Sequence, residues 1–101
     1  MWVRVARFEG GTAEGLDAEV ARTQEQLKQG GSAPPGLEGV TRVVEAIDRE
    51  RGSAVALIYC DTEEDMRMAH EALDAMTPSA EASGRRVSVD VYEVKNDIEL
   101  G

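Results

Sequence analysis

The stretch YCDTEEDMRMAH, residues 59–70, holds the chain's only histidine, its only cysteine and one of its two tyrosines. Histidine changes its protonation near neutral pH, so His70 could remove a proton from a bound substrate. Tyr59 could line the pocket in which that substrate binds. Cys60 follows Tyr59 directly, and successive strand residues point to opposite faces, so these two cannot line one cavity. His70 and Tyr59 are therefore the candidate catalytic residues.

The same stretch also fits a strand that runs into a capped helix. Asp61 or Thr62 can accept hydrogen bonds from the first helical amides, and Glu64 follows Asp61 at the spacing of a capping box. Apolar residues then recur around the histidine with helical periodicity, at Met66, Ala69, Leu73 and Met76. His70 therefore has two interpretations, as a hydrogen-bonded packing residue or as a base in a pocket, and the apolar stripe favours packing.

The elements that must position these residues follow from the hydrophobic pattern. Strands are expected over residues 2–8, 40–47, 54–60 and 87–94, where β-branched residues are frequent or apolar and polar residues alternate. Helices are expected after Thr12 and after Asp61 or Thr62, and turn-rich segments at 29–39 and 77–84 follow them. The order βαββαβ predicts a single α+β domain over residues 1–101, a ferredoxin-like sandwich with a four-stranded antiparallel sheet.

Two helices can cover only one face of such a sheet. Val3 and Val5 are expected beneath the helices, together with the valines of the last strand, Val87, Val89 and Val91. The open face would then carry Trp2, Arg4, Ala6 and Phe8 from the first strand, and Ser88, Asp90, Tyr92 and Val94 from the last. This face is too apolar for water and suits an interface or a lined cavity. Trp2, Arg4, Asp90 and Tyr92 are the candidate substrate-binding residues, with Arg4 and Asp90 expected to pair across neighbouring strands.

The overall charge argues against several classes of partner. The chain has 20 acidic and 11 basic residues, a formal net charge of −9, so nucleic acid and anionic membranes are not expected partners. No apolar run approaches the roughly 18 residues of a membrane span. One cysteine excludes an internal disulfide and agrees with a cytoplasmic location. With one histidine and one cysteine, no metal site is expected.

The chain resembles the antibiotic biosynthesis monooxygenase-like family of the dimeric α+β barrel superfamily. The resemblance covers nearly all of the sequence and rests on RFEGG at the first strand exit, PPGLEGVTRV before the second strand, and IYCDTEEDMRMAHEA at the junction of third strand and second helix. It implies a homodimeric barrel in which two protomers pack their open sheet faces together. It also implies a pocket between the sheet and the helical layer of each protomer. Members include cofactor-free oxygenases of polycyclic phenols and quinols, and haem-degrading enzymes.

Individual positions match the family only in part. Tyr59 stands where relatives often place Trp or Tyr, and His70 lies on the helix where many relatives carry a histidine. Haem-degrading members pair that histidine with a first-strand asparagine. The first strand here, WVRVARF, contains none, so haem is not expected and the predicted cofactor is none.

Two functions remain open at this point. In the first, the protein is a small cofactor-independent monooxygenase: Arg4 or Tyr92 stabilises the oxyanion of an aromatic substrate, His70 removes a proton, and the substrate itself reacts with oxygen. In the second, the protein is a non-catalytic homodimeric module that binds a small molecule or a partner. An enclosed cavity with converging polar groups would favour the first, and a filled barrel the second.

Overall fold

The structure of the chain is a computed structural model that describes residues 1–28, 33–76 and 84–101. The described residues form β1 (Trp2–Glu9), α1 (Ala13–Lys28), β2 (Val40–Asp48), β3 (Ser53–Cys60), α2 (Glu63–Asp74) and β4 (Arg85–Glu93). This is the predicted order, and each strand boundary lies within two residues of the predicted one. Residues 29–32 and 77–83 of the two predicted turn segments lie outside the described residues.

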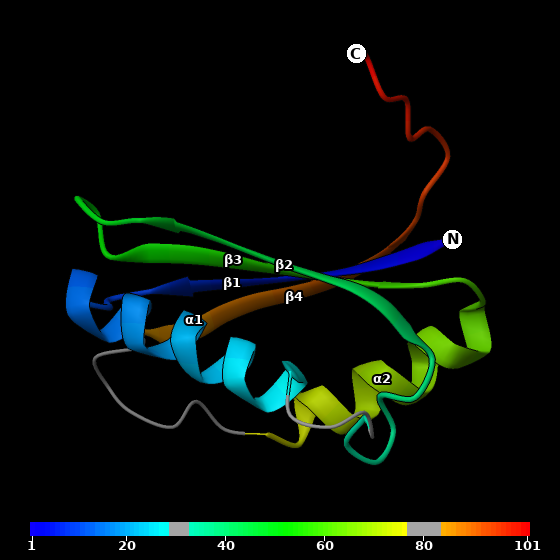
Figure 1. Ribbon diagram of the computed structural model, residues 1–101, viewed down its shortest axis with the longest axis horizontal. Helices are drawn as coiled ribbons and strands as arrows, with labels where there is room; N and C mark the ends of the chain where they lie inside the picture. The colour runs from blue at the N-terminus through cyan, green and yellow to red at the C-terminus, as the bar shows by residue number, and fades with distance from the viewer. Residues whose placement is uncertain (29–32, 77–83) are drawn as a thin grey trace.

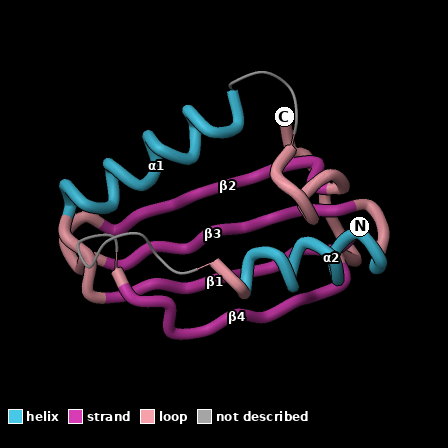
Figure 2. Tube along the Cα trace, turned by 90° about the horizontal axis from the view of Figure 1, so that it is seen from below, coloured by secondary structure: helices cyan, strands magenta, loops and turns pink. Residues whose placement is uncertain are grey.

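The four strands form one sheet in the order β2-β3-β1-β4, and every neighbouring pair is antiparallel. The first and last strands are therefore adjacent, as the ferredoxin-like arrangement requires. Both helices lie on one face of the sheet, and the other face carries no helix in the described part of the chain (Figures 1 and 2). The predicted α+β ferredoxin-like fold is confirmed. Neither described helix is long and apolar enough to cross a membrane.

Threonine side chains cap the N-terminal ends of both helices. The Thr12 hydroxyl accepts a hydrogen bond from Gly15 N at 3.0 Å, and the Thr62 hydroxyl accepts one from Asp65 N at 3.1 Å. Thr62 has extended backbone angles, as an N-cap requires. Of the two cap candidates for α2, Thr62 is therefore the cap. The three acids that follow it lie in the first turn of α2, where the helix dipole favours negative charge.

A tight turn joins β2 to β3, and the segment that precedes α1 is hydrogen-bonded to this turn. The carboxylate of Asp48 accepts hydrogen bonds from Glu50 N and Arg51 N, both at 3.1 Å. Gly52 has a φ of +68°, and its carbonyl accepts a hydrogen bond from Gly11 N at 2.9 Å. A side chain at Gly52 would collide with the Gly11 carbonyl oxygen. The turn therefore depends on glycine at this position.

The structure reverses the predicted faces of the first strand. Arg4 pairs with Ile58 and Ala6 with Ala56, and Arg4, Ala6 and Ile58 are all buried on the side of the helices. Val3 and Val5 instead pair with Tyr59 and Leu57 on the open face. The alternation of residues sorted β1 into its two faces correctly. The face with Val3 and Val5, which was expected beneath the helices, is instead the open face. The prediction that Trp2, Arg4, Ala6 and Phe8 lie on the open face was wrong.

The faces of the last strand follow the prediction more closely. Val89 and Val91 pair with Ala6 and Arg4 on the helical side, while Asp90 and Tyr92 pair with Val5 and Val3 on the open side. Val87 departs from the expected pattern, because the register shifts at Arg7/Phe8, and it is 42% exposed. Val91 lies on the helical side but is 38% exposed, so it is not packed beneath the helices as expected. Arg4 and Asp90 lie on opposite faces, so their predicted pairing across the strands was wrong.

The best-packed part of the core lies under α2. Cys60, Met66 and Ala69 are fully buried together, and Trp2, Leu37 and Val40 pack against them. Burial raises the pKa of the Cys60 thiol, and the negative charges of Asp65 and Asp61 raise it further. Cys60 is therefore an unreactive core residue on the opposite face from Tyr59, as the alternation of β3 predicted.

Candidate functional site

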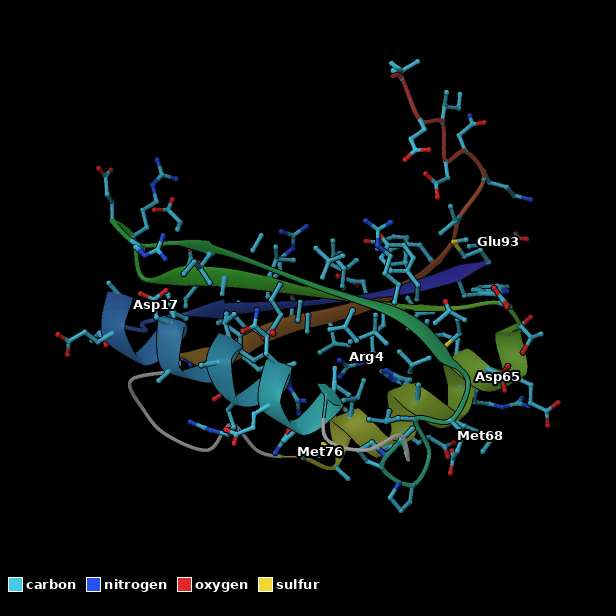
Figure 3. The ribbon with its side chains drawn as sticks, viewed as in Figure 1. Arg4, Asp17, Asp65, Met68, Met76 and Glu93 are labelled. Atoms are coloured by element: carbon cyan, nitrogen blue, oxygen red, sulfur yellow. The ribbon has the colours of Figure 1, made fainter. Side chains whose placement is uncertain are left out.

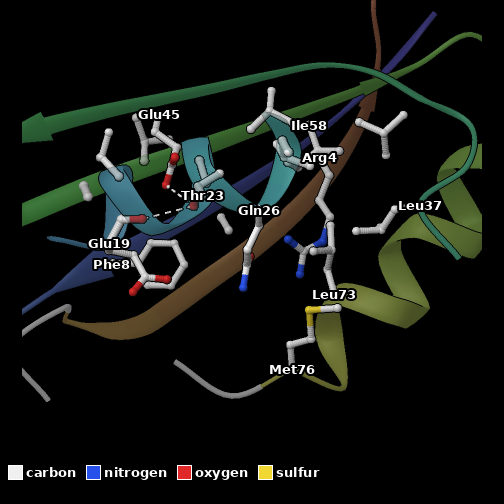
Figure 4. Close-up of a pocket in the computed structure, with 18 of the residues that line it drawn as sticks. Arg4, Phe8, Glu19, Thr23, Gln26, Leu37, Glu45, Ile58, Leu73 and Met76 are labelled. Atoms are coloured by element: carbon white, nitrogen blue, oxygen red, sulfur yellow. Dashed lines mark hydrogen bonds between the residues drawn. The ribbon is translucent and has the colours of Figure 1, made fainter. Parts of the chain in front are cut away.

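A cavity of about 580 Å³ lies between the sheet and the two helices. Its walls come from all four strands, from the inner side of α1, from the segment before β2 and from the last turn of α2. Most of the lining is apolar, including Ala6, Phe8, Leu16, Val20, Ile58 and Leu73. Figure 4 shows Arg4 at one side of this space and Glu45 with Thr23 and Glu19 at the other, with Gln26 of α1 between them.

Arg4 is the buried charge of this site. Its side chain leaves β1 toward the helices and is 3% exposed (Figure 3). Nε donates a hydrogen bond to Nδ1 of His70 at 3.2 Å. Nη2 is buried and has no hydrogen-bond partner among the described residues. A guanidinium nitrogen at the cavity wall therefore has donor capacity left for a ligand.

His70 is the hydrogen-bond partner of Arg4. An Nδ1 atom that accepts a hydrogen bond carries no proton, so the neutral imidazole has its proton on Nε2. The contact fixes one edge of the Arg4 guanidinium from α2, and the Arg4 side chain also lines the cavity. His70 itself is not part of the described cavity wall. The histidine is therefore placed to orient Arg4, which is closer to the packing interpretation than to the role of a base.

A second guanidinium lies at the same end of the cavity. Arg86 donates to the carbonyls of Leu73 and Asp74 at 3.2 Å each and forms an ion pair with Asp74 at 3.6 Å. These contacts satisfy carbonyls at the C-terminal end of α2. Burial lowers the pKa of Arg4, the positive charge of Arg86 lowers it further, and Asp74 opposes both. An arginine remains protonated at neutral pH despite this, so this end of the cavity is cationic.

Glu45 places an acidic group at the other end of the cavity. Its Oε2 lies 3.5 Å from the hydroxyl of Thr23, which also donates to the Glu19 carbonyl at 3.1 Å. Burial raises the pKa of Glu45, the Thr23 hydrogen bond opposes this, and the charge of Glu19 adds to it. Sequence reasoning missed Glu45. The available signal was that, of the two acids in strand VTRVVEAID, Glu45 alternates onto the face shared by the apolar residues Val43 and Ile47.

The other predicted site residues lie outside this cavity. Tyr59 is on the open face, where the Arg42 guanidinium lies 5.6 Å from its ring centroid. Tyr92 is on the same face and 54% exposed, and Asp90 lies beside it. Trp2 faces the helices but packs against the Cys60 core. The sheet therefore separates Tyr59 from His70, and of the six predicted site residues only Arg4 lines the cavity.

The described residues contain no group of three or more histidine, cysteine, aspartate or glutamate side chains placed to hold a metal ion. The positively charged end of the cavity, at Arg4 and Arg86, is suited to an anion and not to a cation. The predicted absence of metal and cofactor stays a prediction.

Comparison with known proteins supports the fold. No protein-family model matches this sequence, and no curated protein matches it. Among solved structures it is similar to a Deinococcus radiodurans protein provisionally described as an antibiotic biosynthesis monooxygenase. The TM-score is 0.57 at 14% identity, over 100% of this chain and 99% of that one. A likeness at this identity shows a shared fold over the whole domain, and it agrees with the family resemblance found in the sequence.

Proposed function

We propose that this chain is a cofactor-independent monooxygenase-like protein that binds an aromatic molecule, a polycyclic phenol or quinol, in the cavity between sheet and helices. The observation that carries the proposal is Arg4, a 3% exposed guanidinium at the cavity wall whose Nη2 lacks a partner among the described residues. An oxyanion on the ligand is the natural acceptor for that nitrogen.

The energetics favour an anionic aromatic ligand over a neutral apolar one. A buried donor without a partner costs roughly 1–3 kcal/mol, and more when the group is charged. A phenolate, enolate or carboxylate oxygen at Nη2 would remove this cost and form a charge-assisted hydrogen bond. The apolar walls would hold the rings, and a cavity of about 580 Å³ is within the usual range for small-molecule sites.

The oxidation that such a site could support is balanced without a cofactor. In an anthrone-like substrate, one methylene carbon becomes a carbonyl, O₂ supplies that oxygen atom, and the second oxygen atom leaves as water. The substrate supplies all the electrons, and its methylene proton must be lost before it reacts with O₂. Arg4 would stabilise the oxyanion that forms when the proton leaves.

One observation favours the second candidate function, a non-catalytic binding module of the same fold. His70, the base predicted from the sequence, already uses Nδ1 to accept a hydrogen bond from Arg4. Its contact orients a binding residue and leaves proton removal to another group. Binding of the aromatic anion is therefore common to both functions, and turnover is what separates them.

We also propose that a second copy of the chain covers the open sheet face, giving the homodimeric barrel. Val3, Val5 and Leu57 lie on this face beside Tyr59 and Tyr92. The C-terminal residues after β4 rise on the same side of the sheet (Figure 1), where Ile98 and Leu100 are 71% and 93% exposed. An apolar strand face with an apolar tail beside it is better suited to another protein surface than to water.

Oxygen uptake with anthrone as the probe tests the function. We expect wild type to form anthraquinone with one O₂ consumed per turnover, and Arg4→Met to lower kcat/KM by at least a hundredfold. Arg67→Met, an exposed substitution on α2, is the matched control and should match wild type. Anthrone binding without oxygen uptake would favour the binding module. If anthrone and 2-naphthoate both fail to bind, the proposed site is wrong.

A further inference from the structure

The cavity has two polar ends of opposite charge, and the sheet register sets the distance between them. Ala6 pairs with Ala56, and Ala56 pairs with Glu45, so Arg4 lies two residues along and two strands across from Glu45. With about 3.3 Å per residue and about 4.8 Å between strands, their Cα atoms are roughly 12 Å apart. The floor between them is apolar, formed by Ala56 and Ile58.

The Glu45 end is built to accept hydrogen bonds. The single hydroxyl proton of Thr23 has a nearer acceptor in the Glu19 carbonyl, 3.1 Å away, than in Glu45 Oε2, 3.5 Å away. Glu45 therefore keeps acceptor capacity that Thr23 does not fill. Its carboxyl group and the side chains of Thr23 and Glu19 lie together at this end of the cavity (Figure 4). An anion placed here would be repelled, whereas a hydroxyl or amine could donate to Glu45.

We propose that the cavity selects an aromatic hydroxy acid, or an aromatic amino acid analogue of the same length, in one orientation. Its anionic group binds Arg4, its rings lie on the apolar floor, and a hydroxyl or amine at the far end donates a hydrogen bond to Glu45. Glu45 is thus a specificity-determining residue. The inference rests on the proposed function, because it assumes that Arg4 binds the anion.

The orientation follows from charge alone. The reversed ligand would place its carboxylate beside Glu45 and would leave Arg4 Nη2 facing a neutral group. Like charges at close range and an unpaired buried guanidinium both disfavour that arrangement. A ligand without the far hydroxyl would still bind at Arg4, but it would leave unused the acceptor capacity of the half-buried Glu45 that Thr23 does not fill. Hydrogen bonds to charged groups of this kind correspond to about ten- to a hundredfold in affinity.

Two matched probes test the inference by isothermal titration calorimetry: 6-hydroxy-2-naphthoate, which has both polar groups, and 2-naphthoate, which lacks the hydroxyl. We expect wild type to bind the hydroxy acid ten- to a hundredfold more tightly than 2-naphthoate. Glu45→Leu should abolish this preference while leaving 2-naphthoate affinity unchanged or improved. Glu50→Leu, an exposed substitution in the β2–β3 turn, should keep the preference. Arg4→Met should weaken binding of both probes.

The outcomes separate this inference from the proposed function. If wild type binds the two probes equally, or if Glu45→Leu weakens both by the same factor, the role of Glu45 is overturned while the Arg4 site stands. If wild type binds neither probe, both proposals are wrong. The comparison of probes on wild type does not depend on the variants, so equal binding would overturn the inference even if Glu45→Leu fails to fold by circular dichroism.

Discussion

Nε of Arg4, in the middle of β1, donates a hydrogen bond to Nδ1 of His70 on α2 at 3.2 Å, across 66 residues of sequence. This bond ties the central strand to the second helix and holds the buried guanidinium at the cavity. His70, for which the sequence left open a packing role and a role as a base, is therefore the hydrogen-bond partner of Arg4, which the sequence analysis had expected on the opposite face of the sheet.

Removing the imidazole should be costly, and an amide should replace it in part. His70→Ala leaves Arg4 Nε without its acceptor, so we expect the free energy of unfolding to fall by about 1–3 kcal/mol. His70→Asn keeps an oxygen near the position of Nδ1 and should recover much of that loss. Urea denaturation of the three proteins measures this. Equal losses in both variants would show that the hydrogen bond contributes nothing and that only packing volume matters.

The carboxyl of Glu45 should make stability depend on pH. Burial raises its pKa above the usual glutamate value of 4.5, so the folded protein keeps this proton to higher pH than the unfolded chain does. The contribution to the free energy of unfolding is therefore full below that value and is lost as pH rises through the folded pKa. Between about pH 4 and pH 7, Glu45→Gln should gain stability relative to wild type.

Urea titrations at several pH values in this range measure the difference between the two proteins. Glu50→Gln, at an exposed position in the β2–β3 turn, is the control and should follow wild type at every pH. A Glu45→Gln difference that does not change with pH would show that Glu45 titrates as it would in water.

The cap of α2 gives a local prediction. Thr62→Ala removes the acceptor of the 3.1 Å hydrogen bond from Asp65 N and should lower the free energy of unfolding by about 1 kcal/mol. The neighbouring Asp61→Ala should have a clearly smaller effect, because Thr62 occupies the cap position. Thermal and urea unfolding measure both. An equal or larger loss for Asp61→Ala would contradict the assignment of the cap.

Alanine substitutions at two glycines with positive φ can distinguish the cost of backbone strain from the cost of a steric clash. Gly10→Ala (φ +77°) would meet nothing within 4 Å and should cost only the strain of the left-handed region, about 1–2 kcal/mol. Gly52→Ala has similar strain, but its new methyl group would also collide with the Gly11 carbonyl oxygen. We expect Gly52→Ala to be the more destabilising of the pair in urea unfolding. Equal losses in the free energy of unfolding would show that the turn shifts to accommodate the new methyl group at no energetic cost.

The open sheet face predicts the state of assembly. Light scattering after size exclusion should return twice the 10.9 kDa mass of one chain at micromolar concentration. Leu57→Asp would bury an unpaired charge in the interface and should shift the protein to monomer. Met68→Asp is the control, because Met68 is exposed and lies on the helical layer (Figure 3). A wild-type mass of one chain would overturn the dimer.

Local patterns in the sequence determined the elements of this protein. The caps at Thr12 and Thr62, the apolar periodicity and the turn residues each act within a few positions of the chain, so they could be read without knowledge of the fold. The order βαββαβ and the adjacency of β1 and β4 followed from them. The alternation that separates Cys60 from Tyr59 is equally local, and the structure confirms it.

The tertiary structure alone decided which face of β1 turns inward and which polar groups meet there. Alternation sorts residues onto two faces, but their environment depends on partners far away in sequence. Arg4 lies beneath the helices because His70 on α2 accepts the hydrogen bond of its Nε, while its buried Nη2 has no partner among the described residues. Glu45 shares a cavity with Arg4 because β2 and β1 lie on either side of β3. Packing between distant segments therefore brings the two charges into one cavity. The spacing of Arg4 and Glu45 along the chain does not predict this.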